Sequence, residues 1–67
     1  MNWQQIEGKW KEVMGRAKEQ WGRLTDDELT KLNGKRDQLA GLIEQKYGLA
    51  KEEVETQIRA FEKTCHS

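Results

Sequence analysis

Residues 3–21 read WQQIEGKWKEVMGRAKEQW. At about 100° per residue, the apolar side chains of this stretch fall on one face of a helix, and they are Trp3, Ile6, Trp10, Val13, Met14, Ala17 and Trp21. Asn2, followed three residues later by Gln5, is typical of a capping box at a helix start. The stretch therefore predicts one amphipathic helix over 3–21.

The rest of the chain predicts three shorter helices. Thr25 and Glu28 form a second capping box, and Asn33 with Gly34 ends the helix that follows. Apolar spacings of three and four residues continue to the end of the chain, and no window alternates as a strand would. We therefore expect an all-α fold, a four-helix bundle in which two hairpins pack across each other, with helices over 3–21, 26–32, 35–47 and 51–64.

The composition indicates one small, folded domain over residues 1–67. Apolar residues make up 34% of the chain and charged residues 36%, while twelve basic and twelve acidic residues give a net charge of zero. Low hydrophobicity favours disorder chiefly when net charge is high, so this balance is compatible with folding. It also removes the electrostatic argument for a general nucleic-acid binder.

The expected location is the cytoplasm. No stretch approaches the roughly 20 apolar residues that a membrane span requires. The N-terminal residues lack the basic start and apolar run of a secretory signal. Cys65 is the single cysteine, so it has no partner for an internal disulfide, which favours a reducing compartment.

Two segments of the chain share one pattern. Residues 8–22 and 34–48 both fit G-K-x5-G-x5-[WY]-G without a gap, at an offset of 26 positions. This agreement predicts an internal repeat produced by duplication of one helical unit.

Three glycines in these segments, Gly8, Gly15 and Gly41, point away from the apolar faces of their predicted helices. A glycine inside a helix costs roughly 0.5–1 kcal/mol relative to alanine. We weigh three interpretations: tolerated surface positions, a contact surface where another backbone approaches closely, or a chain that orders only with a partner or at low water activity. The sequence leaves all three open.

A second candidate feature is the tryptophan face with its neighbouring lysines. The face with Trp3, Trp10 and Trp21 is compatible with a platform on which nucleic-acid bases stack or with a membrane-interface belt. The basic residues of the same helix are Lys9, Lys11, Arg16, Lys18 and Arg23. Acidic residues are interleaved with these lysines, however, and stand four residues before a base, which is the favourable order for ion pairs along a helix; the predicted pairs are Glu7–Lys11, Glu12–Arg16 and Glu19–Arg23. Packing of the tryptophans in the core is the favoured interpretation, with Trp3 partly exposed.

The chain offers no catalytic or metal-binding constellation. Asp26, Asp27 and Glu28 are explained by helix capping and lack the spaced ligands of a calcium loop. Cys65 and His66 are too few for a four-ligand zinc site within one chain. A nucleophile needs a base and an orienting group, and the only histidine stands next to the last residue. We expect no enzyme activity, cofactor or metal.

Several runs resemble the CsbD-like family of small bacterial stress-response proteins. They are the segment from Trp10 to Leu29, which contains KEQWG and LTDD, and the segment GKRDQL with Gly41 and Tyr47-Gly48. The resemblance covers nearly the whole chain, except Lys63 to Ser67. It implies two orthogonally packed helical hairpins, similar to the SAM-domain arrangement, and a cytoplasmic protein. It supplies no activity, cofactor or functional residue.

The leading hypothesis is therefore a non-enzymatic general stress-response protein that acts through abundance or by binding another macromolecule, protein or nucleic acid. One alternative is a nucleic-acid or envelope-associated binding module. Another is a hydration-sensitive protectant that gains helix on drying. The expected state is a monomer or a weak homo-oligomer, and the candidate interaction residues are Trp3, Gly8, Lys9, Lys11, Gly15 and Gly41.

Overall fold

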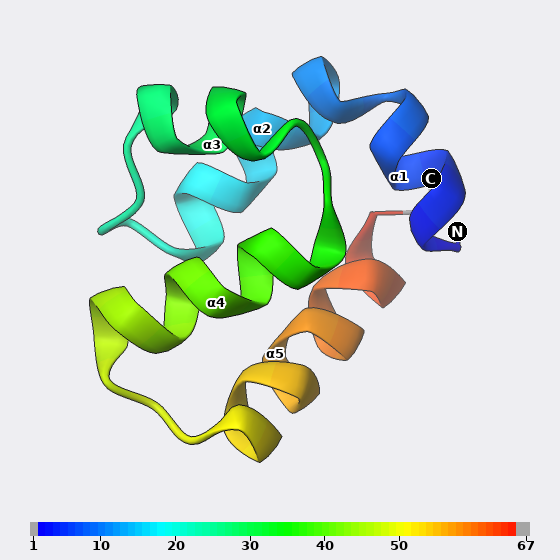
Figure 1. The fold of residues 1–67 in the computed structure, drawn as a ribbon. Helices are drawn as coiled ribbons and strands as arrows, with labels where there is room; N and C mark the ends of the chain where they lie inside the picture. Colours follow the sequence, from blue (N-terminus) through cyan, green and yellow to red (C-terminus); the bar gives the residue numbers. More distant parts are fainter. Residues whose placement is uncertain (1, 66–67) are drawn as a thin grey trace.

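The computed structural model describes residues 2–65, and within that range every regular element is a helix. Figure 1 shows the arrangement of the helices, α1 (Trp3–Gly8), α2 (Trp10–Gln20), α3 (Asp26–Leu32), α4 (Arg36–Tyr47) and α5 (Lys51–Thr64). The all-α expectation is confirmed for these residues.

The prediction of one continuous helix over 3–21, and with it the count of four helices, is wrong. Lys9 lies between α1 and α2 with φ −113° and ψ 28°. Its N–H donates to the carbonyls of both Gln5 and Ile6 at 3.1 Å, so the helical ladder is disturbed there. Gly8 is a weak helix former at which a bend costs little. The bend turns α1 toward the α3–α4 connection, where the indole of Trp3 donates to Gly34.

The predicted helix starts and the remaining boundaries agree with the structure. Asn2 and Thr25 each form the expected capping box, with Gln5 and Glu28 as partners. The connection after α3 passes through two residues of left-handed backbone, Asn33 at φ 51° and Gly34 at φ 80°. The predicted spans 26–32, 35–47 and 51–64 match α3, α4 and α5 to within one residue.

The helices pack mainly as two consecutive pairs, α2 with α3 and α4 with α5, and both pairs can be followed in Figure 1. The rings of Trp21 and Phe61, 4.9 Å apart between centroids, join the first pair to the last helix. The core consists of apolar residues from all five helices and the α2–α3 connection, together with Cys65; they are Ile6, Trp10, Val13, Ala17, Trp21, Leu24, Leu29, Leu32, Leu39, Ala40, Ile43, Val54, Ile58, Phe61 and Cys65.

In both segments of the predicted repeat a helix begins directly after the lysine, although the backbone before it differs: Gly8 is helical and Gly34 has a φ of 80°. Lys9 is the N-cap residue of α2 and Lys35 is the N-cap residue of α4. Each segment therefore contributes one helix, and each of these helices packs against the helix that follows it. Duplication itself stays a prediction.

None of the helices within residues 2–65 combines the length and the apolar character needed to cross a bilayer.

Candidate interaction surface

All three tryptophans are held by the fold through their indole N–H groups. Trp3 donates to the carbonyl of Gly34 at 2.7 Å, and Trp10 donates to the carbonyl of Leu29 at 2.8 Å. Trp21 donates to the amide oxygen of Gln57 at 2.9 Å. Trp10 and Trp21 are buried, whereas Trp3 is half-buried and packs against the core. The interpretation of these residues as core, with Trp3 partly exposed, agrees with this geometry.

Gly34 is the position where two backbones approach closely. A Cβ atom on Gly34 would lie 3.1 Å from both Cα and Cγ of Glu7. Its positive φ of 80° also favours glycine. Sequence reasoning identified Asn33-Gly34 as a helix end but missed its contact with α1, because that contact depends on the bend at Lys9.

The glycines selected from the sequence face open space instead. A Cβ atom on Gly8, Gly15 or Gly41 would meet nothing within 4 Å. All three are exposed and lie on α1, α2 and α4 respectively. Within the described chain they are therefore surface positions.

Three of the candidate residues come together at the bend between α1 and α2. Gly8, Lys9 and Lys11 line an open surface depression of about 360 Å³, which is completed by Glu7, Trp10, Glu12 and Asn33. We call this feature the bend depression. Trp3, Gly15 and Gly41 do not line this depression. The six candidate interaction residues therefore do not form one surface.

The bend depression presents its lysines to solvent. Lys9 and Lys11 are exposed. Glu7 pairs across the fold with Lys35, whose Nζ lies 2.7 Å from Oε2 of Glu7. The hydrogen bond to Glu7 raises the pKa of Lys35 above its ordinary value. One of the two acids in the depression is therefore already engaged, which leaves Glu12 beside the two lysines.

The ion pairs predicted along the first helix are wrong. Within residues 2–65 the ion pairs join different elements, and they are Lys18–Asp26, Lys35–Glu7, Arg36–Glu55 and Lys46–Glu28. Arg16 donates to the carbonyl of Thr64 and Arg23 to that of Lys46. Spacing along one helix predicts only local partners, whereas folding brings more distant partners within reach.

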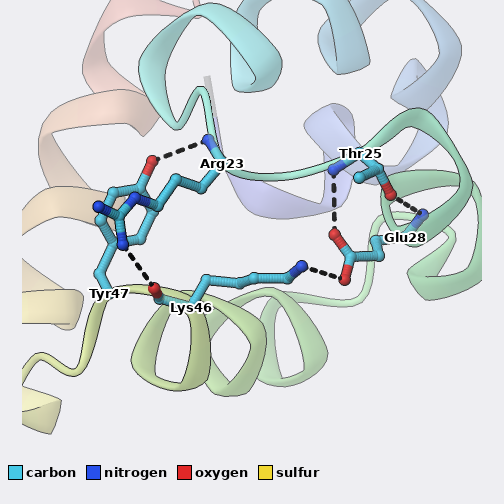
Figure 2. Close-up of polar contacts among 5 residues, drawn as sticks. All are labelled: Arg23, Thr25, Glu28, Lys46 and Tyr47. Carbon is cyan, nitrogen blue, oxygen red and sulfur yellow. Dashed lines mark hydrogen bonds and ion pairs between the residues drawn. The ribbon is translucent and has the colours of Figure 1, made fainter.

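A second polar cluster links the α2–α3 connection to the end of α4. Figure 2 shows its members, Arg23, Thr25, Glu28, Lys46 and Tyr47. The Glu28 carboxylate accepts the backbone N–H of Thr25 at 3.0 Å and lies 2.8 Å from Nζ of Lys46. The hydrogen bonds from Lys46 and from the Thr25 backbone lower the pKa of Glu28. The cap of α3 is thus also an attachment point for α4.

Arg23 and Tyr47 make the other half of this cluster. The backbone N–H of Arg23 donates to the Tyr47 hydroxyl at 3.1 Å, and the Arg23 guanidinium lies 5.4 Å from the centroid of the Tyr47 ring, within the range of a cation–π contact. Figure 2 shows the guanidinium stacked over the ring. Because every member bonds to another member, the cluster positions helices rather than a ligand.

Within residues 2–65, no group of three or more histidine, cysteine, aspartate or glutamate side chains is arranged to hold a metal ion. Asp26, Asp27 and Glu28 lie in the first turn of α3, where acids complement the helix dipole. Cys65 is buried, and burial raises the pKa of its thiol. A buried thiol with a raised pKa is a poor nucleophile. His66 lies outside the described residues.

Comparison with known proteins identifies the family. The CsbD-like family model matches residues 4–56. The chain belongs to the CsbD-like family. It is 51% identical over 64 residues to a UPF0337 protein of Nitrosomonas europaea, covering 96% of this chain and 61% of that relative. It is 53% identical over 61 residues to a UPF0337 protein of Pectobacterium atrosepticum, and these residues cover 91% of this chain and 78% of that relative.

The UPF0337 protein YjbJ of Escherichia coli is 48% identical over 62 residues, which cover 92% of this chain and 80% of YjbJ. The chain thus spans most of YjbJ but less than two thirds of the Nitrosomonas relative. The names of these relatives state no activity, substrate or partner. The resemblance inferred from the KEQWG and LTDD runs is confirmed.

Proposed function

We propose that this CsbD-like domain is a non-enzymatic protein of the bacterial general stress response that acts in the cytoplasm by binding another macromolecule. In this proposal its two helical hairpins pack orthogonally, as in SAM domains, and the domain works as a monomer or a weak homo-oligomer. The bend depression, with Gly8, Lys9 and Lys11, is the proposed contact surface.

The observation that carries this proposal is the difference between polar side chains that hold the helices together and polar side chains that remain unpaired on the surface. Glu28, Lys46 and Arg23 are committed to holding helices together, as is the pair Arg36–Glu55 at 2.8 Å. Lys9 and Lys11 are exposed in the bend depression and make no ion pair within residues 2–65. Lys51 and Lys63 are also exposed and make no ion pair within the described residues. Lys9 and Lys11 differ from them because they line one depression together.

The nucleic-acid alternative is supported by the exposed lysines but not by the burial of the neighbouring tryptophan. Lys9 and Lys11 are placed to contact phosphates, but the neighbouring Trp10 is 5% exposed and its indole N–H is bound to Leu29. A stacking platform requires an accessible ring face. We therefore favour a protein partner, and affinity for a single-stranded oligonucleotide that falls steeply with salt would favour the alternative.

The test is genetic complementation with charge-reversed variants. A strain that lacks its own copy of this protein would receive the wild-type chain, a Lys9→Glu/Lys11→Glu variant, or a control Lys51→Glu/Lys63→Glu variant on α5. Both variants change the net charge equally, and all four lysines are exposed. Survival of osmotic, oxidative and stationary-phase stress would be measured at equal protein levels.

Binding through the bend depression predicts that the control restores survival and that the Lys9/Lys11 variant does not. Circular dichroism of both purified variants would verify equal folding. Full rescue by the Lys9/Lys11 variant would contradict the proposed surface and favour a role through abundance. Helix that forms only on drying would support the protectant alternative instead.

A further inference from the structure

The first two helices combine a continuous sequence pattern with a discontinuous structure. The apolar face from Trp3 to Trp21 fits one straight helix, yet the chain bends at Lys9. Conflicts between a strong local pattern and the folded conformation are expected at functional or strained positions. The bend therefore points to a segment with a second accessible conformation.

Helix α1 is attached to the rest of the fold at few places. Within residues 2–65, the polar contacts that attach it to other elements are the hydrogen bond from the Trp3 indole to the carbonyl of Gly34 and the ion pair Glu7–Lys35. Both attachments end on consecutive residues of the α3–α4 connection. Ile6 is its single fully buried side chain, and Trp3 adds a tilted contact with Trp10 at 6.3 Å between ring centroids.

The alternative conformation is a straight extension of α2. Six residues are too few for α1 to persist as an isolated helix, but joined to α2 they gain its hydrogen-bonded ladder. Lys9 makes this possible because lysine is a good helix former and its exposed side chain makes no ion pair within residues 2–65 that the change would break. Gly8 faces open space, so its backbone is not held by a close neighbour at the bend.

We propose that α1 is a strap that opens about Lys9, by joining α2 in one helix over residues 3–20, while α2 to α5 stay folded. Opening releases the Trp3 indole from Gly34 and parts the ion pair Glu7–Lys35. It uncovers the apolar side of α1 and the ring of Trp10, which together form an apolar surface that the closed fold hides. The strap is a property of the chain's own conformations and does not depend on the proposed binding role.

The three indole N–H groups provide the test, because each is hydrogen-bonded in the closed fold. Native-state hydrogen exchange reports the opening that exposes each group. If α1 opens as a strap, the Trp3 indole exchanges at least about tenfold faster than those of Trp10 and Trp21. The hydrogen bonds of these two indoles, to Leu29 and Gln57, do not involve α1 and break only when the core opens. Equal protection of all three indoles in the wild-type chain would overturn the proposal.

A substitution at the bend separates straightening from simple unfolding of α1. Lys9→Gly keeps the closed conformation but places a glycine inside the straight helix, at a cost that corresponds to about a two- to fivefold smaller open population. Exchange of the Trp3 indole should slow by that factor. In the matched control, Lys11→Gly, the glycine lies inside α2 in both conformations, and Trp3 exchange relative to the wild type should stay unchanged. Trp3 exchange that is unchanged or faster in Lys9→Gly would show that α1 unfolds without joining α2, contrary to the proposal.

Discussion

Trp3 and Gly34 lie 31 positions apart in the chain and are joined by a hydrogen bond of 2.7 Å from the indole nitrogen to the carbonyl oxygen. This bond places α1 against the α3–α4 connection. At the same point the backbone of Gly34 passes close to Glu7, and Lys35 forms an ion pair with Glu7. One short segment of the chain thus fixes the position of the N-terminal helix.

Substitution of Gly34 should therefore be costly. Gly34→Ala adds a Cβ atom 3.1 Å from the Cα atom of Glu7, which overpacks this contact. It also places alanine at a φ of 80°, which strains the backbone. We expect the free energy of unfolding to fall by about 2–4 kcal/mol in urea titrations followed by circular dichroism.

Gly48 is the matched control for this substitution. It also has a positive φ, 63°, but a Cβ atom there would meet nothing within 4 Å. Gly48→Ala should cost only about 1–2 kcal/mol, for the left-handed conformation alone. Equal losses in the two variants would show that the close approach of α1 contributes nothing.

The cap of α3 is a second stability determinant. The Thr25 hydroxyl accepts the backbone N–H of Glu28 at 3.1 Å. Thr25→Ala should lower the free energy of unfolding by about 1 kcal/mol, because the N–H loses its partner. Thr25→Ser keeps the hydroxyl and should restore most of the loss, and a Ser variant as unstable as the Ala variant would argue against the capping role. Thermal or urea unfolding measures both variants.

The exposed glycines inside helices should respond in the opposite direction. Gly15 and Gly41 have ordinary helical backbone and open space around a Cβ atom. Gly15→Ala and Gly41→Ala should each raise the free energy of unfolding by about 0.5–1 kcal/mol. A loss of stability on either substitution would reveal a contact that the structure does not show. Stabilised variants that fail to rescue the deletion strain would identify these glycines as part of the contact surface.

Acid should weaken the fold through two carboxylates. The pKa of Glu28 is lowered by Lys46 and by the Thr25 backbone, and the pKa of Glu55 is lowered by the hydrogen bond from Arg36. A lowered pKa contributes stability that is present above the ordinary value of 4.5 and is lost as pH falls through the lower, folded value. The urea midpoint should therefore decline below about pH 4.5.

Glu28→Gln tests this acid dependence, since glutamine can still accept the N–H of Thr25 but carries no charge for Lys46. The decline on acidification should be shallower in this variant than in the wild type. Glu19→Gln, at an exposed position outside the first turn of α2, is the control and should leave the slope unchanged. If the urea midpoint of Glu28→Gln declined with acid as steeply as that of the wild type, the Glu28–Lys46 pair would be excluded as the source of the decline.

The stability of the fold at alkaline pH depends in part on Lys35. Its pKa is raised by Glu7, so the stability from this pair is present below the ordinary value of 10.5 and is lost as pH rises through the higher, folded value. Lys35→Gln should remove that part of the alkaline decline in the urea midpoint. If the urea midpoint of the variant declined as much as that of the wild type, groups other than Lys35 would be responsible for the alkaline decline.

The sequence predicted those features of the fold that depend on neighbours in the chain. The caps at Asn2 and Thr25 were correct because a capping box involves residues three positions apart. The end of α3 at Asn33 and Gly34 was correct because these residue types tolerate left-handed backbone. The core positions of α5 followed from apolar spacing along one helix.

The features that the sequence did not predict involve distant partners. The bend at Lys9 departs from the local pattern, which fits one straight helix. The contact of Trp3 with Gly34, which no helical periodicity reveals, favours the bend. The ion pairs differ from the prediction for the same reason, since Glu7 finds Lys35 rather than Lys11. Of the candidate surface, Gly8, Lys9 and Lys11 share one depression because of that bend, while Gly15 lies further along α2 and Gly41 lies on α4.

The central claim is that the tryptophans and the α3–α4 connection hold a folded five-helix domain, with α1 docked on Gly34. The most direct measurement is an ¹⁵N-edited nuclear Overhauser spectrum of the dilute protein in the indole N–H region. We predict three dispersed indole signals, with contacts from Trp3 to Gly34, from Trp10 to Leu29 and from Trp21 to Gln57. Collapsed signals without these contacts, or helical contacts that continue through Lys9 in place of the Trp3–Gly34 contact, would contradict it.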